Sequence, residues 1–169
     1  MYHTADEFLL FYVNESATTA KVLGTLTDAS LALEKAAGHN TVGDIAWHIA
    51  TAPVYMLNQV GFILDAALAE KPEQLTAAAI QATHAKLVEQ VKAQAAKLTP
   101  ADLAEVHHVF GMMDWPTATM LAVLLNHEIH HRGQLSVLVR QAGLVVPMIY
   151  GPTKEMSVED IRKKMEGQG

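Results

Sequence analysis

The chain has 169 residues, no cysteine and a formal net charge of −6, and its length fits a single domain over residues 1–169. The lack of cysteine excludes disulfides, iron–sulfur clusters, thiolate zinc sites and cysteine nucleophiles. The negative charge argues against nucleic acid or an anionic membrane as the main partner. Residues 1–7 lack the basic start of a signal peptide and no run of about 18 apolar residues spans a membrane, so we expect a cytoplasmic protein.

The apolar content is high for so small a chain. Hydrophobic residues make up 50% of the sequence, and the mean hydropathy is +0.15. Charged residues make up only 18%, below the usual value of about 25%. Surplus apolar surface on an acidic, water-soluble protein is typical of a buried subunit interface.

The first predicted helix covers residues 4–37 and ends at Gly38, because glycine readily takes the left-handed conformation found after many helices. Its apolar residues recur at spacings that place them along one stripe of a helix. This stripe consists of Phe8, Phe11, Tyr12, Val22, Leu23 and Leu26.

The second predicted helix begins after Thr41 and runs towards Leu64. Thr41 and Asp44 have the spacing of a capping box, in which each side chain accepts a hydrogen bond from the backbone N–H of the other residue. Pro53 lies inside this helix and is expected to bend it, because proline has no N–H to donate to the preceding turn.

A third helix is predicted over residues 76–98, which are rich in alanine, lysine and glutamine, and Thr99 and Pro100 end it. The following stretch, residues 101–114, has no helical pattern. Its composition, with Gly111 near its end, indicates an irregular segment or a short hairpin.

The fourth predicted helix runs from Pro116, a residue type favoured in a first turn, to Ala142, with Gly143 directly behind its end. Residues 145–147 are expected to be extended, and Ser157 to cap a short C-terminal helix. Strand patterns are nearly absent. The fold class is therefore predicted to be all-α, with a four-helix bundle as the natural architecture.

The chain is unusually rich in histidine, with nine histidines compared with only twelve lysines and arginines together. In the fourth predicted helix, His127 and His131 are four residues apart, or about 40° around the helix axis, so their rings can converge on one metal ion. His130 lies about 60° to the other side of His127 and is expected to face outward. The alternative is that these are core or surface histidines that only make hydrogen bonds. Burying several imidazoles in an apolar helix is costly, however, unless a partner occupies their nitrogens.

The same segment matches the H-E-x-x-H pattern of zinc proteases, with Glu128 as general base and Glu155 or Glu159 as a third ligand. The extended form of the pattern fails, because Gly133 falls one place early and no histidine follows at the required distance. No edge strand is predicted to align a peptide substrate. The protease is therefore the weaker interpretation.

A carboxylate-bridged di-iron site is a further alternative, since Glu128–His131 and Glu105–His108 are both Glu-x-x-His pairs. However, Glu105 and His108 lie in a short segment rather than on a long helix, and two further inward glutamates are not evident. The pattern does not favour this site.

A third histidine ligand from the second helix is the remaining option. His48 follows Trp47 and shares a helix face with Ile45 and Ala52, so it is expected to point inward. A lone histidine on an apolar face is more often a core residue than a ligand. Spacing alone does not place His48 beside the fourth helix.

Two blocks of sequence make the chain resemble the DinB/YfiT-like family of metal-dependent enzymes over nearly its whole length. Residues 127–135 (HEIHHRGQL) form the specific block, and residues 41–49 (TVGDIAWHI) form a shorter and weaker one. Residues 138–143 and Pro147 also match the way in which the family leaves its last long helix.

The resemblance implies a four-helix bundle of up-up-down-down topology, often homodimeric, with a metal bound by one histidine from the second helix and two from the fourth. These histidines correspond to His48, His127 and His131. Glu128 is left with a supporting role. Three-histidine sites suit several divalent transition metals, of which zinc or nickel are expected first, with iron, cobalt, manganese or copper as alternatives.

Family members of known activity are mostly S-transferases that use low-molecular-weight thiols such as bacillithiol or mycothiol, with some isomerases and hydrolases. The resemblance thus implies a small-molecule substrate and a metal-dependent thiol transferase or hydrolase, with a non-catalytic metal-binding or structural dimer as the alternative. Three residues are candidates for the surroundings of the site. Asn126 could orient an imidazole, Tyr55 could reach the pocket or pack in the core, and Arg132 could bind an anionic substrate or lie in solvent.

Overall fold

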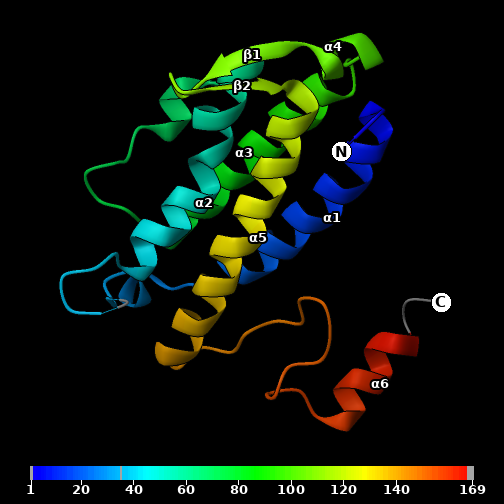
Figure 1. Cartoon of the computed structure of the whole chain (residues 1–169). Helices are drawn as coiled ribbons and strands as arrows, with labels where there is room; N and C mark the ends of the chain where they lie inside the picture. The colour runs from blue at the N-terminus through cyan, green and yellow to red at the C-terminus, as the bar shows by residue number, and fades with distance from the viewer. Residues whose placement is uncertain (1, 35, 167–169) are drawn as a thin grey trace.

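The computed structural model describes residues 2–34 and 36–166, which are mostly helical (Figure 1). The long helices of the described chain are α1 (Ala5–Leu23), α2 (Val42–Leu57), α3 (Ala77–Ala95) and α5 (Thr117–Gln141). The shorter elements are the 3-10 helices η1 (Asp28–Ser30), η2 (Asn58–Val60) and η3 (Ala66–Ala69), the helices α4 (Pro100–Ala104) and α6 (Val158–Glu166), and the strands β1 (Val106–Val109) and β2 (Met113–Pro116).

The long helices pack side by side, with α1 and α2 each lying against both α3 and α5 (Figure 1). Helices α1 and α5 run in one direction, and α2 and α3 run in the other. The start of α3 therefore meets the end of α1, where Gln81 donates to the Leu23 carbonyl. Likewise, the end of α3 meets the end of α2, where the Gln94 amide makes two hydrogen bonds with the backbone of Ile63.

This chain order differs from the predicted up-up-down-down order, in which the first two long helices are parallel. The cause lies in the connections. The described residues between these helices, 24–34 and 36–41, turn back at the end of α1, so that α2 runs antiparallel to it. The long crossover comes one connection later, over residues 58–76, and it makes α3 parallel to α2.

Helix α1 ends at Leu23, well before the predicted end at residue 37. The Thr25 hydroxyl donates to a carbonyl of the last turn at 2.8 Å, and Thr27 and Ser30 then cap each other at the start of η1. Short polar side chains of this kind compete with the helix for backbone groups. Gly38, the predicted end, lies in the loop before α2 with a φ of +75°.

Helix α2 begins as predicted and ends early. Thr41 and Asp44 form the predicted capping box, with backbone-to-side-chain distances of 3.0 and 3.1 Å. The helix contains Pro53 and ends at Leu57 rather than near residue 64. The chain turns away at Gly61, whose φ of +87° is one that glycine adopts without steric cost.

A short antiparallel hairpin connects α4 to α5. The hairpin interpretation is therefore confirmed for residues 106–114, whereas residues 101–104, predicted to be non-helical, lie in α4. Its register places Val106 opposite Pro116 and Val109 opposite Met113, and Gly111 takes a φ of +65° in the turn. Because of this hairpin the fold is mostly helical rather than all-α.

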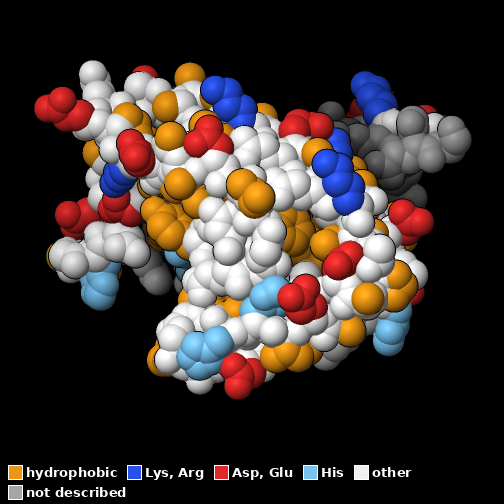
Figure 2. Space-filling view, turned by 90° about the horizontal axis from the view of Figure 1, so that it is seen from above, with side chains coloured by type: hydrophobic (Ala, Val, Ile, Leu, Met, Phe, Trp, Pro, Cys, Tyr) orange, Lys and Arg blue, Asp and Glu red, His pale blue; other side chains and the backbone are white. Residues whose placement is uncertain are grey.

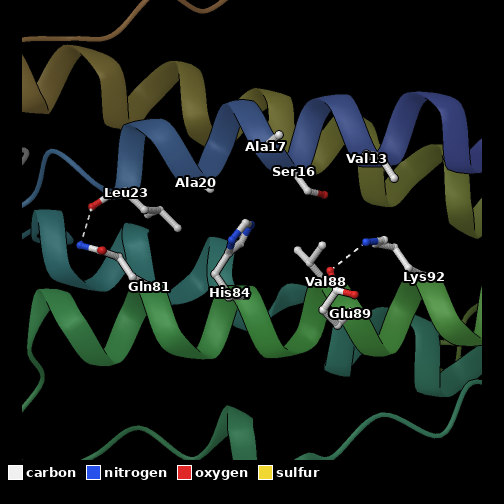
Figure 3. A pocket seen from close by; sticks show the side chains of 11 residues that line it. Val13, Ser16, Ala17, Ala20, Leu23, Gln81, His84, Val88, Glu89 and Lys92 are labelled. Carbon is white, nitrogen blue, oxygen red and sulfur yellow. Dashed lines mark hydrogen bonds and ion pairs between the residues drawn. The ribbon is translucent and has the colours of Figure 1, made fainter.

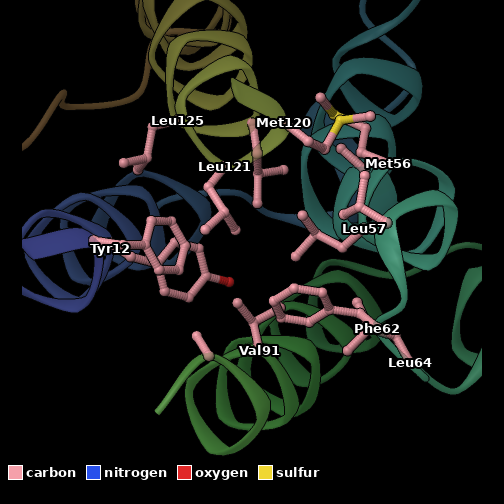
Figure 4. Close-up of a cluster of buried hydrophobic side chains, with 14 of the residues drawn as sticks. Tyr12, Met56, Leu57, Phe62, Leu64, Val91, Met120, Leu121 and Leu125 are labelled. Atoms are coloured by element: carbon pink, nitrogen blue, oxygen red, sulfur yellow. The ribbon is translucent and has the colours of Figure 1, made fainter. Parts of the chain in front are cut away.

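Buried apolar side chains from the long helices fill the interior in two clusters. The cluster nearer the hairpin is drawn in Figure 4 and includes Tyr12, Leu57, Val91 and Leu121. The cluster at the other end includes Val22, Ile45, Ile80 and Leu135. Burying each such side chain contributes about 1.5–3 kcal/mol. Of the predicted stripe on the first helix, Phe11 is the exception, since it is 55% exposed while the other five residues are buried.

The C-terminal part of the chain follows its predicted pattern. Gly143, with a φ of +73°, lies just beyond α5, and the predicted terminal helix is present as α6, apart from the long helices (Figure 1). No described helix is both long and apolar enough to cross a membrane. On the face that Figure 2 shows, acidic and basic side chains are interspersed rather than gathered in a field of one sign.

Candidate metal centre

The packing of α2 against α5 brings His48 next to His127 and His131. The Nε2 atoms of His48 and His127 lie 2.9 Å apart, although 79 positions separate the two residues. The centroid of the His48 ring lies 4.7 Å from the ring centroids of both His127 and His131, and those two centroids are 4.4 Å apart. One possible ligand atom from each residue lies within 4.8 Å of the others. The three histidines that the resemblance implied are therefore neighbours in space.

His48 reaches this position because it lies at the edge of the α2 face that packs on α5. Its neighbours Trp47 and Ile49 are buried, whereas His48 is exposed. The prediction that His48 points into an apolar core is therefore wrong. Its side chain lies across the α2–α5 boundary at the surface, where a ligand from solvent can reach it.

The spacing of the three rings fits a small metal ion. Imidazole nitrogens bind zinc at about 2.0–2.1 Å, and a tetrahedral arrangement then separates two ligand nitrogens by about 3.3 Å. The observed 2.9 Å between His48 and His127, and the limit of 4.8 Å for all three, lie on either side of this value.

Gln134 holds the ring of His131. The Nδ1–H of His131 donates to Gln134 Oε1 at 3.0 Å, and the amide of Gln134 donates to Nε2 of His130 at 3.1 Å. A proton on Nδ1 leaves the lone pair of His131 on Nε2, which is the usual state of a metal-binding histidine. His130 is exposed, as its place on the helix predicts. Gln134 was not singled out from the sequence, although its spacing of three from His131 was the available signal.

The cluster favours neutral rings. Burial lowers the pKa of His127 to about 4. The ring of His48 is exposed on one side, but its contact with α5 removes part of its solvent and so lowers its pKa as well. The nearby histidines add to both effects because like charges repel. Both imidazoles are therefore uncharged near pH 7 and carry lone pairs. His127 Nδ1 is buried without a hydrogen-bond partner among the described residues, so no protein acceptor holds a proton on that side of the ring.

A hollow of about 370 Å³ opens beside His48 and His131. It is also lined by Gly38, His39, Asn40, Ile45 and Gln134. Backbone hydrogen bonds from the first turn of α2 to Leu31 and Leu33 hold the loop that carries residues 38–40. The sequence did not point to His39 or Asn40, because their place depends on the path of this loop.

Glu128 faces a different helix from the histidines. It is 7% exposed and interacts with Thr19 and Glu15 of α1, and burial raises its pKa. A general base of a zinc protease has to lie beside the metal ligands, so this position does not support that interpretation. Glu155, considered as a third ligand, instead pairs with Arg140 at 2.7 Å.

Arg132 is buried rather than available to a substrate or to solvent, so both predictions for it are wrong. Its guanidinium is 1% exposed and pairs with Glu15 of α1 at 2.5 Å. It also donates to the Thr19 hydroxyl at 3.1 Å and to the Tyr150 hydroxyl. Arg132 thus joins α5, α1 and the segment after α5.

The other candidates lie away from the cluster. Tyr55 is 58% exposed and donates to the Ala69 carbonyl at 3.4 Å, so it is neither a core residue nor part of the histidine hollow. His108 pairs with Asp114 on the hairpin at 2.8 Å, and Glu105 ends α4. These positions do not support a di-iron site, because the pair does not reach His131.

The chain is thus a mostly helical protein whose candidate centre is a cluster of three histidines between two antiparallel helices. It belongs to the DinB family, whose sequence model matches residues 1–164. The resemblance seen in the sequence is therefore confirmed.

Individual proteins are similar to this chain, in sequence or in structure, over most of its length. The uncharacterized protein YrdA of Bacillus subtilis (strain 168) is 38% identical over 160 residues, which cover 92% of this chain and 93% of YrdA. The crystal structure of a DinB-like protein from Bacillus cereus ATCC 10987 superimposes with a TM-score of 0.75 at 36% identity, covering 89% of this chain and 100% of that one. The DinB-like protein YjoA of Bacillus subtilis has the same fold, with a TM-score of 0.69 at 18% identity, over 85% of this chain and 97% of that one.

Proposed function

We propose that this protein is a metal-dependent enzyme that binds one divalent transition metal ion through His48, His127 and His131 and acts on a small molecule. The observation that carries the proposal is the meeting of three imidazoles from two helices, with ligand atoms within 4.8 Å, beside an open hollow. Three protein ligands and an open position are typical of catalytic metal sites, whereas structural sites are closed by four ligands.

The donor set suits zinc or nickel and also iron, cobalt, manganese or copper. Two of its rings stay neutral near pH 7, because burial of His127 and partial loss of solvent around His48 lower their pKa values. Gln134 keeps the Nε2 lone pair of His131 free by accepting a hydrogen bond from the His131 Nδ1–H. When bound, the ion would supply Lewis acidity, which lowers the pKa of a thiol or a water molecule.

Within this class we favour transfer from a low-molecular-weight thiol, with hydrolysis as the second reaction type. The chain has no cysteine, so the sulfur has to come from a second molecule. The hollow of about 370 Å³ is in the size range of small-molecule sites. His39 and Asn40 offer hydrogen bonds to the polar groups of such a thiol, and Ile45 offers an apolar contact.

We also propose that the fold is a four-helix bundle, with the long helices in the chain order described above, and that the protein is a cytoplasmic homodimer. The high apolar content and the exposed side chains of Leu10 and Phe11 on α1 support a subunit interface. A cysteine-free, acidic chain is compatible with a reducing compartment.

Elemental analysis tests the metal. The protein is purified without a nickel column, and bound metals are measured by mass spectrometry before and after dialysis against a chelator. We expect about one zinc, nickel or other divalent transition metal ion per chain, lost on chelation and regained on titration. Wild-type protein that neither carries nor takes up a stoichiometric metal ion would contradict the proposal.

An activity assay then separates enzyme from binding protein. Bacillithiol and mycothiol are each mixed with a chromogenic aryl halide, and conjugation is followed with wild type, chelated wild type and His48→Ala. We expect conjugation with wild type only. Stoichiometric metal without any turnover would favour the non-catalytic alternative. A peptide-cleaving activity lost in Glu128→Gln without loss of metal would instead favour the protease.

A further inference from the structure

A second hollow, of about 460 Å³, lies between α1 and α3, away from the histidine cluster that α2 and α5 hold (Figure 3). It exists because small side chains meet where two helices usually interlock. Ala17 and Ala20 of α1 and Ala85 of α3 line it, together with Val13 and Val88. The walls are therefore largely apolar.

Two buried polar side chains point into this hollow (Figure 3). Ser16 of α1 is 2% exposed, and its Oγ has no hydrogen-bond partner, although the Tyr12 hydroxyl lies near it. His84 of α3 is 6% exposed, and no hydrogen bond joins its ring to any residue in the described part of the chain. Figure 3 shows the His84 ring directed towards α1 and Ser16 directed towards α3.

Unpaired polar groups in a helix interface are costly. A fully buried donor or acceptor without a partner, such as Ser16 Oγ, destabilises a protein by about 1–3 kcal/mol, and most such groups in folded proteins are paired. The ring nitrogens of His84 also lack a protein partner, but they keep some contact with solvent. The hollow is open along one side, where Ala17, Ala20 and Ala85 are exposed, so a small molecule can enter it from solvent. Apolar walls with two unpaired polar groups are the usual composition of a small-molecule site.

The charges around the hollow indicate a neutral ligand. Burial lowers the pKa of His84 to about 4, so its ring is uncharged at neutral pH. At the rim, Lys92 and Glu89 neutralise each other at 2.8 Å, and the Gln81 amide is engaged with a carbonyl at the end of α1. Among the described lining residues, no charge is left to pair with an ionic group.

We propose that this hollow binds a neutral small molecule with an apolar body and a single hydroxyl group, such as an alkylphenol, whose hydroxyl bonds to both Ser16 and His84. A hydroxyl group fits because it donates one hydrogen bond and accepts others. It can donate to the bare nitrogen of His84 and accept from Ser16, which satisfies both groups at once. This site is independent of the proposed metal function.

The test follows the methyl groups that line the hollow by NMR. Protein labelled at alanine and valine methyls is titrated with 4-butylphenol and, separately, with butylbenzene, which lacks the hydroxyl group. We expect saturable shifts at Ala17, Ala20 and Ala85, with the phenol binding about tenfold more tightly, since two net hydrogen bonds distinguish the probes. Ser16→Ala and His84→Gln should each weaken the phenol about fivefold and leave butylbenzene unchanged.

A matched pair of variants locates the site. Ala17→Leu places a larger side chain in the hollow and should abolish binding of the phenol, whereas Ala82→Leu, at an exposed position of α3 outside the hollow, should leave it unchanged. His48→Ala should also leave it unchanged. Equal affinity for the two probes, or binding that survives Ala17→Leu, would overturn the proposal. So would methyl shifts that follow protein concentration rather than the probe, because a second copy of the chain would then occupy the hollow.

Discussion

His48 Nε2 lies 2.9 Å from His127 Nε2 across the boundary between α2 and α5. At this distance two bare lone pairs repel, so one ring N–H has to donate a hydrogen bond to the other ring unless both nitrogens bind a cation. Gln134 already orients the third ring. Because His48 and His127 belong to different helices, we expect the affinity for a metal ion to depend on how α2 packs against α5.

Loss of one cluster histidine should remove metal binding. We expect His127→Ala and His48→Ala each to weaken zinc binding by more than about 100-fold, since even loss of an outer hydrogen-bond partner of a ligand costs about 10–100-fold. His130→Ala is the matched control, because His130 is an exposed histidine of the same helix. Affinities are measured by competition with a chromophoric chelator.

The control also decides the identity of the ligands. If His130→Ala weakened zinc binding as much as His127→Ala does, then the ligand set would have to include His130. If His48→Ala bound zinc like wild type, the ligand from α2 would be wrong.

Gln134 is expected to act through His131. Gln134→Leu removes the acceptor of the His131 Nδ1 proton and should weaken zinc binding by about 10–100-fold. Gln134→Glu retains an acceptor oxygen and should bind more tightly than Gln134→Leu. Gln141→Leu, at an exposed position of the same helix, should match wild type in the same competition assay. Equal affinities for Gln134→Leu and wild type would refute this role.

The features that could be predicted from the sequence are local ones. The capping box of Thr41 and Asp44 depends on residues three apart, and the common face of His127 and His131 depends on helix geometry alone. The hairpin turn at Gly111 is also a property of adjacent residues. The placement of His48 beside the cluster is not local. The resemblance to a family implied it, while its own sequence surroundings predicted a core residue.

The features that were missed depend on long-range packing. The sequence around Arg132 looks like that of a solvated arginine, because the partner that allows its burial, Glu15, is 117 positions away. The chain order depends on which of two long connections crosses the molecule, and both have similar compositions. The burial of His84 could not be predicted from the sequence, because its helix is rich in alanine and lysine and only the packing of α1 against α3 buries it.

His84 should make the protein less stable as the pH falls. Burial lowers its pKa in the folded state to about 4 from an ordinary value of 6.5. The unfolded chain therefore takes up a proton first, and stability is lost as the pH falls from about 6.5 to about 4. His84 alone should therefore lower the free energy of unfolding by about 2 kcal/mol at pH 5.0 relative to pH 7.5.

Urea unfolding at pH 7.5 and 5.0, in the presence of a chelator, measures this loss. His84→Gln should lose less stability between the two pH values than wild type, by about 1–2 kcal/mol. His3→Gln, at an exposed position near the N-terminus, should show the same dependence as wild type. Parallel curves for wild type and His84→Gln would mean that His84 is not buried as a neutral ring.

The buried ion pair of Arg132 and Glu15 should be costly to break from one side. The Arg132 side chain is 1% exposed and that of Glu15 is 16% exposed, so Arg132→Met leaves a poorly solvated carboxylate. We expect a loss of about 3–5 kcal/mol in the free energy of unfolding. Arg140→Met breaks the exposed pair with Glu155 and should cost no more than about 1 kcal/mol.

A double variant distinguishes this cost from the loss of packing. Glu15→Leu combined with Arg132→Met removes both charges, so it should recover much of the stability that the single Arg132→Met variant loses. If the double variant were as unstable as the sum of the two single variants, the pair would contribute no coupling, and the cost would arise from the lost contacts of Arg132 with Thr19 and Tyr150. Tyr150→Phe, which removes only the hydroxyl group, separates that contact from the charge pair in the same unfolding measurement.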